Sequence, residues 1–393
     1  IVAVVGGDGA GKSTLLRVVT GRVIPASGTV RAPKRHEIGY QPARSGTWAQ
    51  LTVDENLDLV AGAYGLDPAR QSAQRARLLS AAGLVEARGR LASQLSGGMR
   101  QKLGFCMAML HEPVLLVLDE PSTGVDPVSR VELWGLITDA AAAGAAVILS
   151  TTYLDEAERV HDVTVLDDGV PLLTGTPAEV IAAAPGTVTA VTEPTDARRA
   201  WRRGRAWRQW HVGPPEAGDV VVSPDMEDAV VAAALNGRLP SDIPESPAPR
   251  PAGTAGPHRP GGPHLARTFE VTKAFADDVA VDRVTVHVES AEIVGLIGAN
   301  GAGKTTLIRM QIGLLNPTNG HVTLFGEPPS RATRRRLGYV PQGLGLYRDL
   351  TVAENFDFVA RAYGASRTLG NDLQDIADVL VADIGLGRQR QLA

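Results

Sequence analysis

Residues 6–14 read GGDGAGKST, and residues 298–306 read GANGAGKTT. Both stretches fit the pattern G-x-x-x-x-G-K-S/T, and each follows a β-branched run (residues 1–5 and 293–297) and precedes a helical pattern. The glycines of such a loop let the backbone wrap around an anion, so that successive N–H groups point inward and the next helix adds its positive end. The sequence therefore predicts two phosphate-binding loops, each between a strand and a helix of an α/β fold.

Each loop supplies side chains as well as backbone. Lys12 and Lys304 are expected to reach the β- and γ-phosphates of a nucleotide, and the hydroxyls of Ser13 and Thr305 are expected to bind Mg²⁺. The other loop residues predicted to line the phosphate sites are Gly6, Gly9, Gly11, Thr14, Gly298, Asn300, Gly301, Gly303 and Thr306. An ordinary glycine-rich turn is the alternative, but Lys-Ser and Lys-Thr stand in register in the two copies.

Two carboxylates follow the first loop at the end of an apolar run. Residues 113–120, PVLLVLDE, predict a buried strand that delivers its charges to the edge of a parallel sheet. We expect Asp119 to hold the magnesium shell. We expect Glu120 to polarise the attacking water, because that role needs a carboxylate on the water and not on the metal. The alternative is a pair of helix-capping acids after a core strand.

Residues 95–101, LSGGMRQ, lie between the first loop and these carboxylates. Ser96 is predicted to cap a helix that runs toward His111. Together with residues 119–121, DEP, this stretch closely resembles the ABC ATPase family, in which the LSGG stretch is the signature motif and begins the signature helix. The resemblance implies α/β P-loop NTPase cassettes with a helical subdomain, duplicated in tandem and truncated at both chain ends. It also implies ATP and Mg²⁺ as cofactors and ATP hydrolysis as the activity.

In that family two cassettes pair head to tail, with each ATP held between them. By this resemblance Ser96, Gly97 and Gly98 serve the nucleotide held by Lys304, and residues 122–126, STGVD, match the D-loop of the same interface.

Two residues of the second copy match further positions of the family. Gln342 corresponds to the glutamine that senses Mg²⁺ and couples to the permease, and Phe275 corresponds to the aromatic residue that stacks on adenine. The equivalent of Phe275 in the first copy is expected before residue 1.

The duplication extends beyond the loops, since residues 51–57 read LTVDENL and residues 350–356 read LTVAENF. The predicted domains are a first cassette that lacks its N-terminal strands (1–186), an accessory subdomain (187–237), a Pro/Gly-rich linker (238–266) and the front half of a second cassette that stops before its signature (267–393). Within the accessory subdomain, TVTAV and DVVV predict strands with a helix-like stretch between them.

Composition excludes several other classes of protein. A net charge of −4 over 393 residues argues against a nucleic-acid partner, and one cysteine, Cys106, excludes a disulfide framework. We expect Cys106 in a helix core. The longest strongly apolar stretch, residues 140–149, is too short to cross a bilayer.

Residues 198–210, RRAWRRGRAWRQW, fit either a nucleic-acid or lipid-headgroup surface or, as we favour, packed tryptophans with solvated arginines.

Three departures from the family pattern fall in the first copy. Thr152 stands where the family has a switch histidine, and with the acid three residues later it fits a capping box instead. Asp8 replaces the usual asparagine and adds negative charge beside phosphates. Ala43 aligns with the coupling glutamine, and Gln41 lies two residues before that position. The alternative that a local shift brings Gln41 to the position of the coupling glutamine stays open. The hypothesis is an asymmetric motor, in which the site of Lys304 hydrolyses ATP and the first site mainly binds it.

The sequence around these motifs resembles that of the drug and small-molecule export branch of the family. That resemblance implies an ATPase on the cytoplasmic face of the plasma membrane, peripheral to integral-membrane permease subunits or to a fused membrane domain. A soluble tandem-cassette ATPase acting on ribosomes is the alternative. Such proteins typically have long charged helical linkers and keep the switch histidine, so residues 240–263 and Thr152 argue against it. A repair or chromosome ATPase would need an inserted coiled coil or zinc-binding cysteines, which this sequence lacks.

Overall fold

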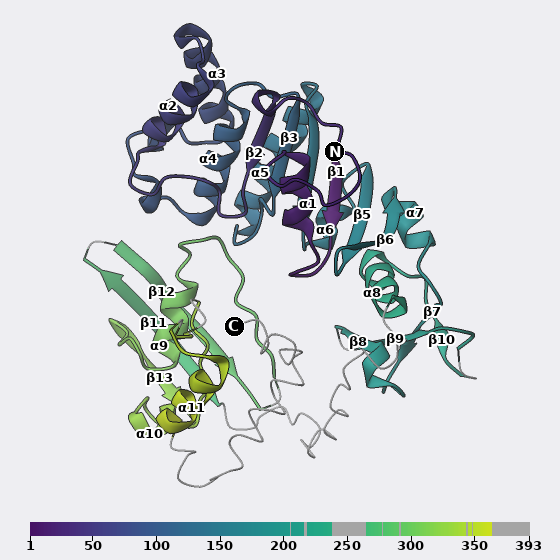
Figure 1. The fold of residues 1–393 in the computed structure, drawn as a ribbon. Helices are drawn as coiled ribbons and strands as arrows, with labels where there is room; N and C mark the ends of the chain where they lie inside the picture. The colour runs from purple at the N-terminus through teal and green to yellow at the C-terminus, as the bar shows by residue number, and fades with distance from the viewer. Residues whose placement is uncertain are drawn as a thin grey trace. The chain divides into compact units, whose positions relative to one another are not determined.

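The computed structural model describes residues 1–204, 206–215, 218–237, 265–276, 278–290, 292–342, 345–347 and 349–363. These residues divide into two compact units, the first made chiefly of residues 1–237 and the second chiefly of residues 265–363 (Figure 1). The predicted linker lies almost wholly outside the described residues, as do residues 364–393 of the predicted second cassette.

The first unit is built on a six-stranded sheet of order β2-β3-β4-β1-β5-β6. All neighbouring strands are parallel except β6, which runs antiparallel to β5. The strands are β1 (Val2–Val5), β2 (Ile38–Gln41), β3 (Leu115–Asp119), β4 (Ala146–Thr151), β5 (Asp162–Asp167) and β6 (Val170–Gly175). Parallel pairing brings the carboxyl ends of β1, β3 and β4 to one edge, where candidate functional residues follow.

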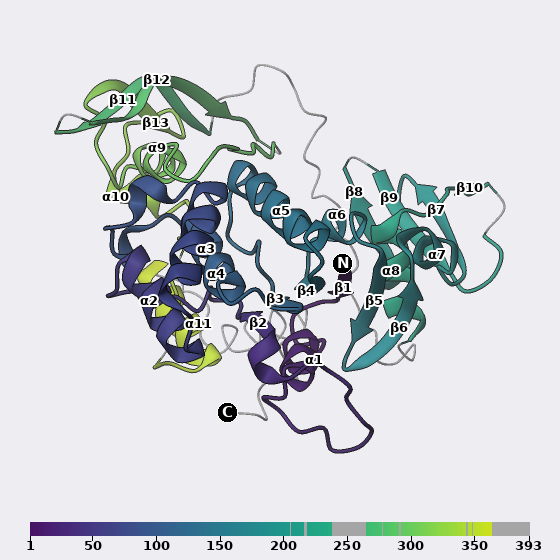
Figure 2. The same ribbon diagram turned by 90° about the horizontal axis from the view of Figure 1, so that it is seen from above.

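Strand β3 is buried on both faces, as its unbroken apolar sequence predicts. Leu116 and Leu118 belong to the main core with Leu133 of α5 (Pro127–Ala142), whereas Val117 shares a second core with Leu16 of α1 (Lys12–Val19). Successive side chains of a strand point to opposite faces, so α1 and α5 cover opposite sides of the sheet (Figure 2). Two short helices, α6 (Leu154–Ala157) and α7 (Pro177–Ala182), add Ala157 and Val180 to the main core, which also contains Leu133 of α5.

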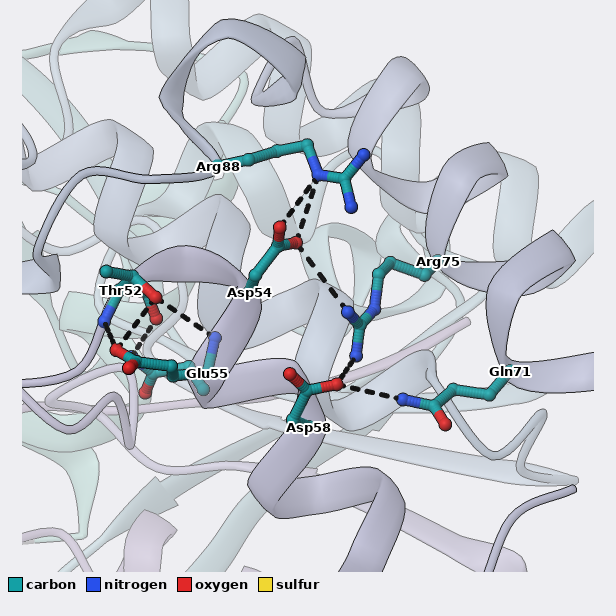
Figure 3. Close-up of polar contacts among 8 residues, drawn as sticks. Thr52, Asp54, Glu55, Asp58, Gln71, Arg75 and Arg88 are labelled. Carbon is teal, nitrogen blue, oxygen red and sulfur yellow. Dashed lines mark hydrogen bonds and ion pairs between the residues drawn. The ribbon is translucent and has the colours of Figure 1, made fainter. Parts of the chain in front are cut away.

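A helical subdomain contains α2 (Val53–Tyr64), α3 (Pro68–Ala81) and α4 (Gly97–Met109). Figure 3 shows the polar side chains that join α2 to α3. Arg75 pairs with Asp58 and lies 3.8 Å from a carboxylate oxygen of Asp54, which also pairs with Arg88 at 2.9 Å. Gln71 donates to Asp58 at 3.2 Å. Partly exposed pairs contribute only about 0–1 kcal/mol each, so they orient α3 more than they stabilise it.

The duplication predicted from the sequence is confirmed, because the second unit repeats the hydrogen bonds that begin α2. Thr52 and Glu55 form a capping box, and Thr351 and Glu354 do the same at α11 (Val352–Tyr363). The matched pairs Asn56 and Asn355, and Tyr64 and Tyr363, donate to equivalent backbone carbonyls.

The second unit contains a three-stranded antiparallel sheet of order β12-β11-β13. Its elements, besides α11, are β11 (Ala266–Phe275), β12 (Asp278–Val288), α9 (Lys304–Gln311), β13 (Asn319–Leu324) and α10 (Arg331–Arg334). The strand expected over residues 293–297 is wrong, because these residues have no regular structure and Ile293 is 99% exposed. A strand of that kind needs parallel neighbours, and the described residues of this unit offer only antiparallel strands.

The accessory region forms a sheet of order β10-β7-β9-β8 beside helix α8 (Met226–Asn236). Its strands are β7 (Thr187–Val191), β8 (Ala200–Arg203), β9 (Ala206–His211) and β10 (Val220–Val221). The expected helix-like stretch is wrong, since β8 and β9 form an antiparallel hairpin there. The expected tryptophan packing is confirmed for Trp210, which is 3% exposed, and for Trp201 beside it. Arg203 is not merely solvated but pairs with Asp225 and Glu227.

Within the described ranges, no helix combines the length and apolar character that crossing a bilayer requires.

Cys106 lies fully buried in α4, as expected, and burial raises the pKa of its thiol to about 12. Because the thiolate is the reactive form, we predict that native protein reacts with a thiol reagent at pH 8 at less than about one hundredth of the rate measured in guanidinium chloride. Absorbance during labelling with a disulfide reagent measures both rates. Stoichiometric labelling of the native protein within seconds would contradict this burial.

Candidate functional site

The first phosphate loop connects β1 to α1 through backbone that requires glycine. Gly9 and Gly11 have φ angles of +83° and +95°, which other residues rarely adopt. A Cβ atom on Gly6 would lie 2.3 Å from the carbonyl oxygen of Leu166, so a side chain there would displace β5. The loop then enters α1 at Lys12, with no side chain capping the helix. The N–H groups of this helix end are thus available to an anion.

The ammonium group of Lys12 is held inside the loop. Its Nζ donates to the carbonyl oxygens of Gly6 at 2.8 Å and Gly7 at 3.0 Å, and it lies 3.1 Å from Oε1 of Glu120. The residue is only 5% exposed. The positive charge is therefore already positioned in the cradle and paired with one acidic partner, which an entering polyphosphate would have to replace.

Asp119 and Ser13 form an oxygen pair beside this lysine. The hydroxyl of Ser13 donates to Oδ1 of Asp119 at 2.9 Å, and the hydroxyl of Ser150 donates to the same oxygen at 2.7 Å. Asp119 is 2% exposed. A carboxylate and a hydroxyl are the hard oxygen ligands that Mg²⁺ takes when phosphate oxygens and water fill its other positions, so these residues fit that ion. Ser150 was not predicted from the sequence, because only its pairing opposite Asp119 in β4 identifies it.

Glu120 has a strained backbone, with φ at +46°. Its N–H donates to the hydroxyl of Ser150 at 3.0 Å, and its Oε2 accepts from Thr123 at 3.2 Å. Left-handed backbone at a non-glycine residue costs on the order of 1 kcal/mol and persists where neighbours fix it. The Glu120 carboxylate thus contacts Lys12 and Thr123, whereas the Asp119 carboxylate contacts the hydroxyls of Ser13 and Ser150. The two carboxylates at the end of β3 thus have different surroundings.

The helix-capping role predicted for Ser96 is confirmed: its Oγ accepts from the N–H of Met99 at 3.2 Å at the start of α4. A Cβ atom on Gly98 would lie 2.5 Å from the Cβ of Ser129, and one on Gly97 would lie 3.1 Å from the carbonyl oxygen of Gly124. These glycines therefore let α4 pack directly on the segment of residues 122–126 and the start of α5.

Asp126 ends that segment as the cap of α5. It accepts from the backbone N–H and the hydroxyl of Ser129 at 3.1 Å and 2.9 Å, and the backbone bond lowers its pKa.

Gln41 does not take the position of the coupling glutamine by a local shift. It is the last residue of β2 and is 0% exposed, and its Nε2 donates to the carbonyl and side-chain oxygens of Gln101 in α4. Gln101 in turn donates to the carbonyl oxygen of Ala43 at 3.2 Å. The amide of Gln41 is thus committed to the signature helix.

The capping box predicted for Thr152 is wrong. The helix begins one residue later than that pattern requires, with Tyr153 as its N-cap, and the exposed Thr152 makes no cap bond. The neighbouring Thr151 makes this turn instead: its hydroxyl accepts from the N–H of Tyr153 at 2.9 Å and donates to the fully buried Glu156 at 2.7 Å. Asp155 pairs with Arg130.

The second phosphate loop repeats the first where α9 begins at Lys304. Gly301 and Gly303 have φ angles of +86° and +83°. A Cβ atom on Gly303 would lie 2.2 Å from the carbonyl oxygen of Ala280, so this loop packs on the hairpin of β11 and β12. Phe275 ends β11 on that hairpin; the residue is 50% exposed, and the ammonium of Lys273 lies 5.3 Å from the centroid of its ring. Of the other predicted residues, Gly298 and Asn300 precede α9, whereas Thr305 and Thr306 lie in its first turn and Gln342 is exposed.

Comparison with known proteins identifies the family of this chain. A family model described as ABC transporter matches residues 1–123 and 281–393. The probable multidrug ABC transporter ATP-binding protein YbhF of Escherichia coli (strain K12) is 33% identical over 443 residues, covering 100% of this chain and 75% of YbhF. The daunorubicin/doxorubicin resistance ATP-binding protein DrrA of Streptomyces peucetius is 36% identical over 192 residues, covering 46% of this chain and 58% of DrrA. A solved ATP-binding subunit of an ABC transporter, 31% identical, aligns with 46% of this chain and 80% of its own at a TM-score of 0.43. This chain therefore belongs to the ABC transporter family, as one of its ATP-binding, ATP-hydrolysing subunits.

Proposed function

We propose that this protein uses ATP to drive export of a drug or another small molecule through a membrane permease. YbhF and DrrA, which are similar to it, are described as multidrug and drug-resistance ATP-binding proteins. The partner is an integral-membrane permease, separate or fused, and the protein is peripheral on the cytoplasmic face of the plasma membrane.

The observation that carries the proposal is the position of Lys12 between the loop carbonyls and Glu120. Nucleotide phosphates offer Lys12 a stronger set of anionic partners than one carboxylate, so binding frees Glu120. Glu120 is then free to orient an attacking water and accept its proton, and Asp119 and Ser13 would hold Mg²⁺. The ion would neutralise charge on the phosphates. The second loop holds ATP through Lys304, Thr305 and backbone N–H groups.

The start of α4 completes a site for nucleotide on another cassette. Ser96 uses one of the free N–H groups of this helix end, and the remaining N–H groups can bind a phosphate. A helix end contributes about 0.3–1 kcal/mol toward an exposed charge, so its effect is greatest once an interface excludes water. We assign this helix end to the nucleotide bound at Lys304 in a head-to-tail pair, and Phe275 to its adenine.

The two sites are unequal in this proposal. At the first, Thr152 is too short to reach a γ-phosphate as imidazole would, Asp8 adds negative charge to the loop, and Gln41 is bound to α4. Loss of one such electrostatic contact typically slows catalysis on the order of a hundred- to a thousand-fold. The first site therefore mainly binds ATP, while the site of Lys304 and the Ser96 helix hydrolyses it with Gln342 as its coupling glutamine.

Replacing the loop lysine tests nucleotide binding directly. Lys12→Ala removes the only side-chain ammonium that contacts the carbonyls of Gly6 and Gly7 among the described residues, and it leaves Glu120 unpaired in the cradle. We expect affinity of the first site for Mg²⁺-ATP to fall on the order of a hundred-fold, measured by calorimetry in a Lys304→Ala background. Lys34→Ala, which removes an exposed lysine, is the matched control. Equal affinity in all three proteins would contradict the assigned role.

Nucleotide trapping tests the inequality of the sites. In the native transporter, vanadate with a photoreactive ATP should label peptides around Lys304 and leave those around Lys12 almost unlabelled. Thr152→His restores an imidazole and should raise labelling at the first site about ten-fold or more, whereas Thr152→Val should not. Equal labelling of both loops in the unmodified protein would disprove the asymmetry without affecting the assignment of ATP binding.

A further inference from the structure

A pocket of about 270 Å³ opens on the first unit beyond the C-terminal end of α1, at the opposite end of that helix from the phosphate loop. Its lining consists of Thr20, Arg22, Arg35, Ile38, Tyr40 and Tyr64. The lining contains two guanidinium groups and two phenol rings but no Asp or Glu. None of these residues belongs to the nucleotide site described above.

Arg22 occupies this pocket without an acidic partner. Its guanidinium lies 4.3 Å from the centroid of the Tyr40 ring, and no carboxylate pairs with it among the residues that the structure describes. Burial raises the pKa values of Tyr40 and Tyr64. At Tyr40 the negative charge of Asp119 raises the pKa further, whereas Arg17 and Arg22 oppose the shift; at Tyr64 the charge of Arg22 opposes it. The guanidinium of Arg22 therefore lies beside the Tyr40 ring, in a pocket whose lining contains no Asp or Glu.

Comparison with the second copy of the cassette indicates which of the lining residues support the fold itself. Arg35 donates to the carbonyl oxygen of Gly21, and its counterpart Arg334 donates to that of Gly313, so this arginine supports the turn in both copies. The two tyrosines also recur, as Tyr339 and Tyr363.

Two lining residues do not recur. In the register that aligns Lys12 with Lys304, Thr20 corresponds to Ile312 and Arg22 corresponds to Leu314. The fold of this turn therefore does not require Arg22, and the first copy has polar groups where the second has apolar ones.

We propose that this pocket is a further anion site, separate from the phosphate loops, which binds a phosphate group through Arg22 and Arg35 with the tyrosine rings beside it. Two guanidinium groups on one pocket favour a doubly charged oxyanion, because their planar N–H donors match its oxygens in pairs. The remaining N–H groups of Arg35 are available after its bond to Gly21. The phosphate belongs either to a soluble compound or to the headgroup of an anionic lipid, and both sources offer the same chemistry to these arginines.

Binding measurements in a protein with disabled phosphate loops test the site. The chain carrying Lys12→Ala and Lys304→Ala is titrated with pyrophosphate by calorimetry, and is separately sedimented with vesicles of phosphatidylglycerol and phosphatidylcholine. Binding of pyrophosphate identifies the soluble source, and binding only to the anionic vesicles identifies the lipid source. In either case Arg22→Leu, which copies Leu314, should weaken binding about ten-fold or more.

The control is Arg31→Leu, which removes an exposed arginine from the same loop outside the pocket and should change the affinity less than about two-fold. Arg22→Gln is the second variant, and thermal unfolding midpoints report whether each variant folds. Absence of binding to both probes would overturn the proposal. An equal loss in Arg31→Leu and Arg22→Leu would overturn it as well, because it would reveal attraction by net charge alone.

Discussion

The ammonium group of Lys12, enclosed by two loop carbonyls and paired with Glu120, is the contact on which the rest of the first cassette depends. It exists only because β1, β3 and β4 are parallel neighbours whose carboxyl ends meet at one edge. β1 delivers the phosphate loop, β3 delivers both acids, and β4 contributes the hydroxyl of Ser150, which binds Asp119 and the backbone of Glu120. Three separate stretches of sequence therefore form one site through strand order alone.

Glycines also allow close packing around α4, next to this site. Gly98 allows the signature helix to touch Ser129, so α4 and α5 share one interface. The amide of Gln41 ties β2 to the same helix. These contacts therefore join β2, α4 and the start of α5 in one packed region.

Features set by neighbouring residues in the sequence were predictable, and features set by strand partners were not. The phosphate loops, the buried strand before Asp119 and the cap by Ser96 each follow from a local pattern, and the structure confirms them as elements. The pairing of Lys12 with Glu120 and the burial of Gln41 depend on which strands are adjacent. Residues 293–297 fail as a strand for the same reason, since β-branched sequence forms a parallel strand only where neighbours exist. The hairpin of β8 and β9 was not predicted, because Trp201, Trp207 and Trp210 do not follow the alternation of a half-buried strand.

The most direct test of the account is a crystal structure of this chain with Mg²⁺ and a non-hydrolysable ATP analogue. The account predicts that Lys12 Nζ leaves Glu120 and contacts phosphate oxygens, while Ser13 turns its hydroxyl oxygen to the ion beside Asp119. A structure at saturating analogue in which Lys12 remains paired with Glu120, and the phosphates lie outside the loop, would contradict it.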